Sequence, residues 1–236
     1  MSAVIRDRRT PTRERERILH SRDRFWHPED LTVSPSTRQH LLAELVDHDE
    51  LRRIRRGLYW RGTKSPLGMA PPPTDVLINE LAPGPGVGPA GLYAANLLRL
   101  STQVPRRAEI AVPTRAPESV SSVRFVARPA RSGRIKAKLN HTEVALLEVL
   151  ASWESTIELA PYEAWARLLE LLATESVRIE RIAAAARTEP ASTRVRLCEL
   201  LRASGQDTLA DRIPAPDSRT RTGAMRVLEG VMKVVA

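Results

Sequence analysis

Residues 51–60 read LRRIRRGLYW, and this stretch decides the fold expected for the N-terminal part of the chain. Its leucine, isoleucine, tyrosine and tryptophan residues favour strands. They flank Arg55-Arg56-Gly57, which has the composition of a tight turn. The stretch is therefore predicted to form a two-stranded hairpin with a basic tip.

The segment before the hairpin is predicted to be helical. A first helix is expected from Thr12 to about Arg24, and a short helical turn at 28–31 has proline at a permitted first position. Ser34 and Pro35 are residue types preferred at the N-cap and first position of a further helix, which is expected to end at Val46 or Asp47. Helix, short helix, helix and hairpin is the order of a winged helix-turn-helix, so we expect one at residues 1–64.

The helix expected after Ser34 has a buried stripe and an opposite, exposed face. At 100° per residue, Leu41, Leu42, Leu45 and Val46 form the stripe. Arg38 projects toward this buried side and is a weaker candidate for reading bases. The residues expected to reach base edges lie on the opposite face or its flanks, and they are Ser36, Thr37, Gln39 and His40.

The predicted hairpin, or wing, is rich in arginine and contains no acid between residues 51 and 64. Such a run repels itself unless a polyanion relieves it, and the arginine fork matches phosphate oxygens. The residues expected to contact DNA from the wing are Arg52, Arg53, Arg55, Arg56 and Arg61.

The formal charge of +9 is concentrated in two blocks of the 236-residue chain. Residues 1–64 carry 15 basic and 10 acidic groups, and residues 99–138 carry ten and two. Clustered basic charge attracts polyanions, and phosphate contacts supply most non-specific DNA affinity. The second block is left with two interpretations, an extended DNA footprint or a site for an acidic or RNA-bound protein.

The rest of the chain is predicted to be a second domain, so the whole protein is expected to be α+β. Residues 65–73 are rich in glycine and proline and are expected to be a linker to a domain at 74–236. That domain is expected to be mostly helical with a small β-sheet. Strands are expected at 108–112 and 123–127, a loop at 83–91, a basic loop or hairpin at 128–138, and helices at 75–81, 91–100, 142–151, 161–173, 175–186, 191–203 and 223–235.

The sequence contains few motifs that indicate catalysis, metal binding or membrane insertion. The five histidines lack paired metal-ligand spacing, and the single Cys198 excludes a disulfide framework and a cysteine-based zinc site. We expect no enzyme activity, no metal and no cofactor. No apolar run approaches the ~20 residues that span a bilayer, and the N-terminus lacks the apolar region of a secretory signal. A cytoplasmic protein without a membrane partner is therefore expected.

Three stretches resemble the AbiEi-like antitoxins, the transcriptional-regulator half of bacterial type IV toxin–antitoxin pairs. The wing, LRRIRRGLYWRG, is similar to the family's basic strand that ends in Arg-Gly-x-Tyr. GLYAANLLRLSTQVPRRAEIAVP at 91–113 is similar to its small-residue helix, turn and strand, and KLNHTEVALLEVL at 138–150 is a weaker match. None of these stretches is a catalytic signature.

The resemblance implies a winged helix that binds operator DNA, an inverted repeat, and represses its own operon. It also implies a C-terminal antitoxin domain that counteracts a nucleotidyltransferase-like toxin, directly or indirectly. The wing departs from the family pattern in its density of arginine, which bears on sequence preference rather than on DNA binding itself.

Two other function classes stay open. One is a ligand-sensing winged-helix regulator without a toxin partner, which the neighbouring gene would distinguish. The other is an enzyme acting on nucleic acid, which requires carboxylates or histidines clustered in a cleft. Repressors of this kind often bind paired half-sites, so a monomer and a homodimer both remain open.

Overall fold

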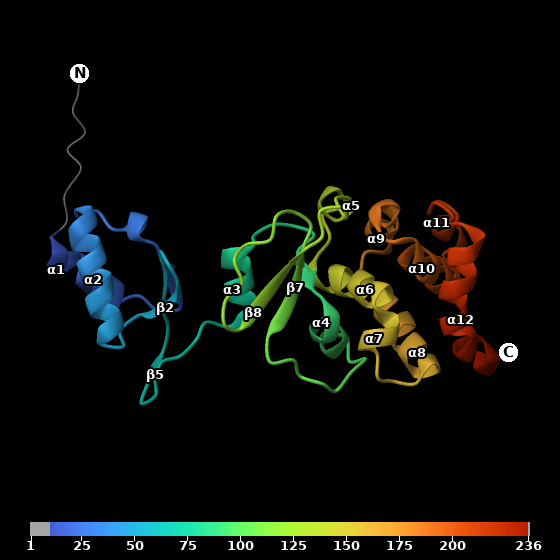
Figure 1. The fold of residues 1–236 in the computed structure, drawn as a ribbon, viewed down its shortest axis with the longest axis horizontal. Helices are drawn as coiled ribbons and strands as arrows, with labels where there is room; N and C mark the ends of the chain where they lie inside the picture. Colours follow the sequence, from blue (N-terminus) through green and yellow to red (C-terminus); the bar gives the residue numbers. More distant parts are fainter. Residues whose placement is uncertain (1–9, 236) are drawn as a thin grey trace, which may run out of the picture. The chain divides into compact units, whose positions relative to one another are not determined.

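The computed structural model describes residues 10–235 and shows an α+β protein (Figure 1). Its internal contacts divide the chain into two compact units between Glu80 and Leu81. Residues 1–9 of the domain expected at 1–64 lie outside the described residues.

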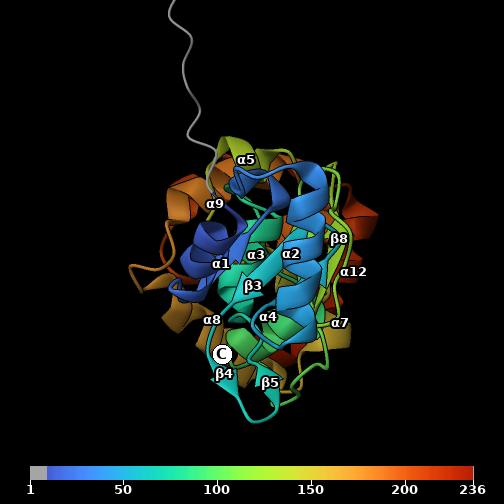
Figure 2. The ribbon, with the colours of Figure 1, turned by 90° about the vertical axis from the view of Figure 1, so that its left-hand side faces the viewer.

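The first unit combines short helices with a three-stranded antiparallel sheet. The strand order is β1-β3-β2, so the second hairpin strand is central. Figure 2 looks onto two helices of this unit, α1 and α2, with β3 visible between them. The elements are α1 (Pro11–Leu19), β1 (Arg24–Trp26), the 3-10 helix η1 (Pro28–Asp30), α2 (Pro35–Asp47), β2 (Arg52–Arg55), β3 (Leu58–Arg61), β4 (Lys64–Ser65), β5 (Gly68–Met69) and α3 (Thr74–Leu81).

Local sequence explains where α2 begins and which side it buries. The Ser34 side chain accepts a hydrogen bond from the Thr37 backbone N–H at 3.3 Å, and Pro35 occupies the first turn. Leu41, Leu42 and Leu45 are buried in a cluster that includes residues of α1 and β1. The helix predicted after Ser34 and the short turn that became η1 are both confirmed.

The prediction that the first helix extends to about Arg24 is wrong. The helix ends at Leu19, and Arg24–Trp26 is a strand that pairs with β3. Trp26 is fully buried, and its Nε1 donates to Ser21 Oγ at 3.0 Å. Pairing with a distant strand and burial of the indole therefore override the helical pattern of this charged segment.

Part of the expected linker is folded onto the first unit. The hairpin β4–β5 lies within residues 64–69, and Met69 is buried. Arg52 Nη1 donates to the Met69 carbonyl at 3.1 Å, and the Gly62 N–H approaches Met69 Sδ at 3.2 Å. The first unit thus extends through β5 into α3, beyond the boundaries of 64 and 74 that composition suggested.

The second unit is largely helical around a three-stranded mixed sheet. In this sheet β7 pairs antiparallel with β6 and parallel with β8. The elements are β6 (Gly88–Pro89), α4 (Gly91–Leu97), β7 (Ala108–Val112), β8 (Val123–Ala127), α5 (Gly133–Lys136), α6 (His141–Ala151), α7 (Trp153–Thr156), α8 (Pro161–Leu172), α9 (Ile179–Ala185), the 3-10 helix η2 (Ala186–Thr188), α10 (Ala191–Ala203), α11 (Asp207–Ala210) and α12 (Ser218–Val235).

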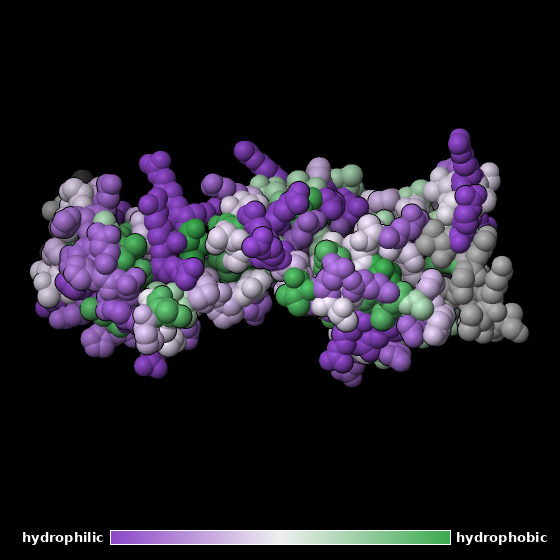
Figure 3. Space-filling view, turned by 60° about the horizontal axis from the view of Figure 1, so that its bottom comes forward, coloured by the Kyte–Doolittle hydropathy of each residue, from purple (hydrophilic) through white to green (hydrophobic). Residues whose placement is uncertain are grey.

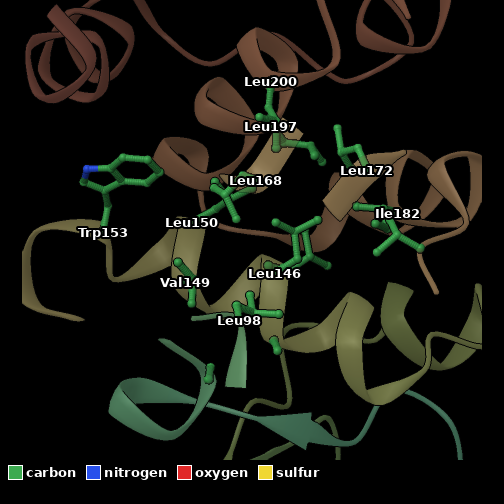
Figure 4. Packing of buried hydrophobic residues seen from close by; sticks show 14 of the residues in the cluster. Leu98, Leu146, Val149, Leu150, Trp153, Leu168, Leu172, Ile182, Leu197 and Leu200 are labelled. Atoms are coloured by element: carbon green, nitrogen blue, oxygen red, sulfur yellow. The ribbon is translucent and has the colours of Figure 1, made fainter. Parts of the chain in front are cut away.

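Helix α6 lies at the centre of the core of this unit. Every residue from Glu143 to Leu150 is buried. Leu146 and Leu150 pack among Leu168 of α8 and Leu197 of α10 (Figure 4). A helix that is apolar on most sides is expected in the middle of a bundle, and this one supports the sheet and the later helices together.

Most predicted elements of the second unit are confirmed, and five differ. The helix expected at 91–100 ends at Leu97. The strands at 108–112 and 123–127 are β7 and β8, and the helix at 191–203 is α10. The expected loop at 83–91 contains β6, a strand too short to show a period in sequence. Residues 128–138 contain the short helix α5, α9 begins at residue 179 instead of 175, and α12 begins at residue 218 instead of 223.

Candidate nucleic-acid interface

A groove of about 610 Å³ lies between α2 and the β2–β3 hairpin. Side chains from η1, α2, β2 and β3 line it. Its charged and amide-bearing lining residues are Glu29, Arg38, Gln39, Asp47, Arg53 and Arg56. On the face of the first unit seen in Figure 3, hydrophilic residues predominate, with smaller apolar areas between them.

The hairpin register decides which arginines face this groove. Arg53 pairs with Tyr59, and residues directly opposite in a ladder share one face of the sheet. Both line the groove. Arg52 pairs with Trp60 and so lies on the other face. The register shifts between Arg53 and Arg55, and the turn uses Gly57 at φ +76°, where glycine is favoured.

Three wing arginines have no internal role in the described structure. Arg53 and Arg56 are exposed, and Arg55 is half-buried. Among residues 10–235, no hydrogen bond or ion pair engages any of the three side chains. Three guanidinium groups are therefore held close together in sequence without a carboxylate partner.

Arg52 and Arg61 have structural partners instead. Arg52 donates a hydrogen bond to the Met69 carbonyl. Arg61 donates to the carbonyls of Glu50 and Leu19 at 3.3 Å each and lies 3.3 Å from a Glu50 carboxylate oxygen. Lys64 contacts the same carboxylate at 2.7 Å, and this hydrogen bond lowers the pKa of Glu50. The structure therefore separates Arg61 from the unpaired wing arginines with which the sequence grouped it.

The five predicted site residues on α2 differ in their contacts and exposure. Ser36 and Thr37 contact the Ser34 hydroxyl at 3.2 and 2.7 Å, at the start of the helix. Arg38 is half-buried, and its Nε donates to the Val33 carbonyl at 3.0 Å. The exposed side chains are Ser36, Gln39 and His40, and of all five only Arg38 and Gln39 line the groove.

Two acidic residues in the groove were not among the predicted site residues. Asp47 is exposed at the end of α2, and Glu29 is exposed on η1. The helical projection already places Asp47 on the face of Ser36 and His40, so a signal for it existed. No sequence signal connects Glu29 with the wing, because only the tertiary fold brings η1 to this groove.

Three arginines of the second basic block are held inside the second unit. Arg134 is fully buried, and its Nη1 donates to Glu148 at 2.8 Å. Arg128 and Arg131 also pair with Glu148. Burial would raise the pKa of Glu148, but the three arginines hold it below its ordinary value. This part of the block stabilises the fold rather than presenting charge to a partner.

The other cations of that block lie on the surface. Two of them have partners within the unit, because Arg107 donates to the Val120 carbonyl at 2.6 Å and Arg124 lies 3.7 Å from Glu109. The exposed cations are Arg99, Arg106, Arg107, Arg115, Arg124, Lys136 and Lys138.

Residues 10–235 contain no group of three or more His, Cys, Asp or Glu side chains placed to hold a metal ion. Within that range, no helix combines the length and apolar character needed to cross a bilayer.

Comparisons with known proteins bear on the fold alone. No protein-family model and no curated protein matches the chain. The chain is similar to the crystal structure of the RV2827C protein from Mycobacterium tuberculosis, with a TM-score of 0.52 and 19% sequence identity. The similarity covers 89% of this chain and 85% of that chain, so it extends across both units.

Proposed function

We propose that the first unit is a winged helix-turn-helix that binds DNA, with α2 as the recognition helix and β2–β3 as the wing. The observation that carries this proposal is the set of three unpaired arginines on the β2–β3 hairpin, Arg53, Arg55 and Arg56, of which Arg53 and Arg56 line the groove beside α2. Three neighbouring guanidinium groups without a carboxylate partner repel one another, and contacts with phosphates would offset this repulsion.

The two elements contribute differently to binding. The wing arginines neutralise backbone phosphates, which supplies affinity without sequence information. Gln39 is the best-placed reader of bases, because it is exposed on α2, lines the groove and has the amide that pairs with adenine. Asp47 and Glu29 repel phosphates and so favour one path of the backbone past the groove.

The binding proposal is tested with the full chain and the DNA upstream of its own gene. Replacing Arg53, Arg55 and Arg56 with alanine is expected to weaken binding at least tenfold. The matched control replaces Arg187, Arg212 and Arg219 of the second unit, which are exposed, and it removes the same charge. Equal losses in the two triple variants would contradict the proposed role of the wing.

We further propose that the protein is an antitoxin that represses its own operon and counteracts a nucleotidyltransferase-like toxin. The sequence resemblance to the AbiEi-like antitoxins supports this, and the DNA binding proposed above for the first unit is consistent with it. Co-expression with a nucleotidyltransferase-like reading frame from the neighbouring gene is expected to restore growth that the toxin alone arrests. Growth arrest that persists despite soluble antitoxin would contradict this role.

A second candidate function is a ligand-sensing regulator, and one cavity favours it. A cavity of about 530 Å³ in the second unit lies where β7 ends at Val112 and extends to Glu118. Crevices beyond the carboxyl ends of parallel strands often bind ligands, and this volume suits a small molecule. A metabolite that changes operator affinity in the absence of any toxin gene would favour this function.

A further inference from the structure

The second unit contains another pocket, of about 540 Å³, next to a nearly buried arginine. Its walls come from the end of α6, from α7, from the first two turns of α10 and from α12. Arg196 of α10 lines it, and only 6% of the Arg196 side chain is exposed.

The protein satisfies the Arg196 guanidinium incompletely. Arginine has five N–H donors. Nη1 donates to the Leu150 carbonyl at 2.7 Å, Nη2 lies 3.5 Å from Glu154, and Nε is buried without a hydrogen-bond partner among the described residues. The Glu154 side chain is 70% exposed, so its charge is well solvated. Burial accordingly lowers the pKa of Arg196, and Glu154 only partly offsets this.

Arg134, in the same unit, is a buried arginine whose guanidinium group has more complete hydrogen bonding than that of Arg196. Two glutamates accept hydrogen bonds from three of its guanidinium nitrogens, at 2.7 to 2.8 Å. A buried polar group that lacks such partners destabilises the fold, and a buried charge does so more strongly. Arg196 is therefore less completely paired than Arg134, and it also lines the pocket.

Other features of the pocket also suit an anion. Helix α10 has 13 residues, and no side chain caps its N-terminus, where Pro190 is the N-cap residue. Ser192 in its first turn lines the pocket and has no hydrogen bond to another described side chain. The opposite wall includes Gly223, where an added Cβ would meet no atom within 4 Å.

We propose that this pocket binds a small organic oxyanion, a phosphate or a carboxylate, with Arg196 as its principal ligand. The arginine fork matches both groups, and the first-turn N–H groups of α10 add donors of the same kind. The volume exceeds that of a bare ion and lies in the range of small-molecule sites, so the anion is expected to carry an organic substituent. The site is independent of the proposed DNA interface.

The probes are inorganic phosphate and acetate, added to the full chain at constant ionic strength with chloride as the reference. The readout is the thermal midpoint followed by tryptophan fluorescence, to which the pocket residue Trp153 contributes. At ten times the half-saturating concentration, the midpoint is expected to rise by about 3 to 6 °C. A response to phosphate alone or to acetate alone identifies the headgroup.

Three variants locate the effect. Arg196→Met removes the charge. Gly223→Leu fills the open wall and keeps Arg196, so it still tests the pocket if the Arg196 variant fails to fold. Both are expected to abolish the response. The triple alanine variant of the wing is expected to keep the response, because the proposed site does not include the wing. A retained response excludes anion binding at the wing as its cause. No rise above chloride, a response that persists in either pocket variant, or its loss in the wing variant would overturn the proposal.

Discussion

Arg134 and Glu189 form a two-point ion pair inside the second unit, with Nε 2.7 Å from Oε1 and Nη2 2.8 Å from Oε2. Neither side chain has exposed surface. The pair joins α5, which lies in the second basic block, to the residue that follows η2. A segment that resembled a charged surface loop in sequence is therefore an internal support of the fold.

Replacing Glu189 with glutamine is expected to destabilise the second unit by about 3–5 kcal/mol, because it leaves the buried Arg134 charge undercompensated. Urea unfolding followed by circular dichroism measures the change. Glu170→Gln is the control, since its pair with Arg167 is exposed and is expected to contribute less than about 1 kcal/mol. Similar losses in the two variants would contradict the internal role of the pair.

Glu158 is expected to titrate far below an ordinary glutamate. Its carboxylate accepts hydrogen bonds from the Ser101 hydroxyl at 2.7 Å, the Thr102 N–H at 2.8 Å and the Gln103 amide, and these lower its pKa to about 2. Because the folded pKa is depressed, this contribution to stability is present above the unfolded value of about 4.3 and is lost as the pH falls through 2.

Carbon-13 chemical shifts of the Glu158 carboxyl follow this titration directly. Ser101→Ala removes the first of its hydrogen bonds and is expected to raise the midpoint. Thr174→Ala, which removes a hydroxyl bonded to the Leu171 carbonyl, is the control and is expected to leave it unchanged. A midpoint near 4.3 in the unaltered protein would show that these hydrogen bonds do not form.

Gly62→Ala is expected to destabilise the first unit by about 1–3 kcal/mol, the cost of overpacking a filled core. An added Cβ at this position would overlap the Trp60 indole nitrogen, and the Trp60 side chain is buried. Tryptophan fluorescence during urea unfolding measures the effect. Gly57→Asn is the control, because asparagine tolerates the positive φ of the turn and meets no neighbour there.

Gln39→Ala is expected to reduce affinity for the specific operator by about 5- to 150-fold, the equivalent of one lost two-point base contact of about 1–3 kcal/mol. Binding to an unrelated duplex should change little, because the wing arginines remain. Competition between the two duplexes measures the ratio. A uniform loss on both duplexes would assign Gln39 to the backbone instead of to a base.

Local signals were sufficient for much of the fold. The Ser34-Pro35 start of α2, the Gly57 turn and the strand at 108–112 each depend on neighbours in sequence, and all three were predicted. Strand β1 was missed because its partner β3 lies more than 30 residues away. The β6 strand was missed because two residues cannot display a period.

The candidate site was predicted in composition but not in detail. The arginines between residues 52 and 61 lie on the predicted hairpin, but charge alone does not show which side chain is already paired. Arg61 is paired because Glu50, just before the hairpin, reaches it across the sheet. The Arg134 cluster was missed for the same reason, because its carboxylates come from residues 14 and 55 positions away.

The most direct test of the proposed DNA interface is the salt dependence of binding. The slope of log affinity against log salt is measured for the full chain and for the variant with alanine at Arg53, Arg55 and Arg56. Each lost phosphate contact is expected to reduce the slope by about 0.9, so three contacts predict a reduction of about 2 to 3. An unchanged slope would contradict the account, because the unpaired arginines would then not contact DNA phosphates.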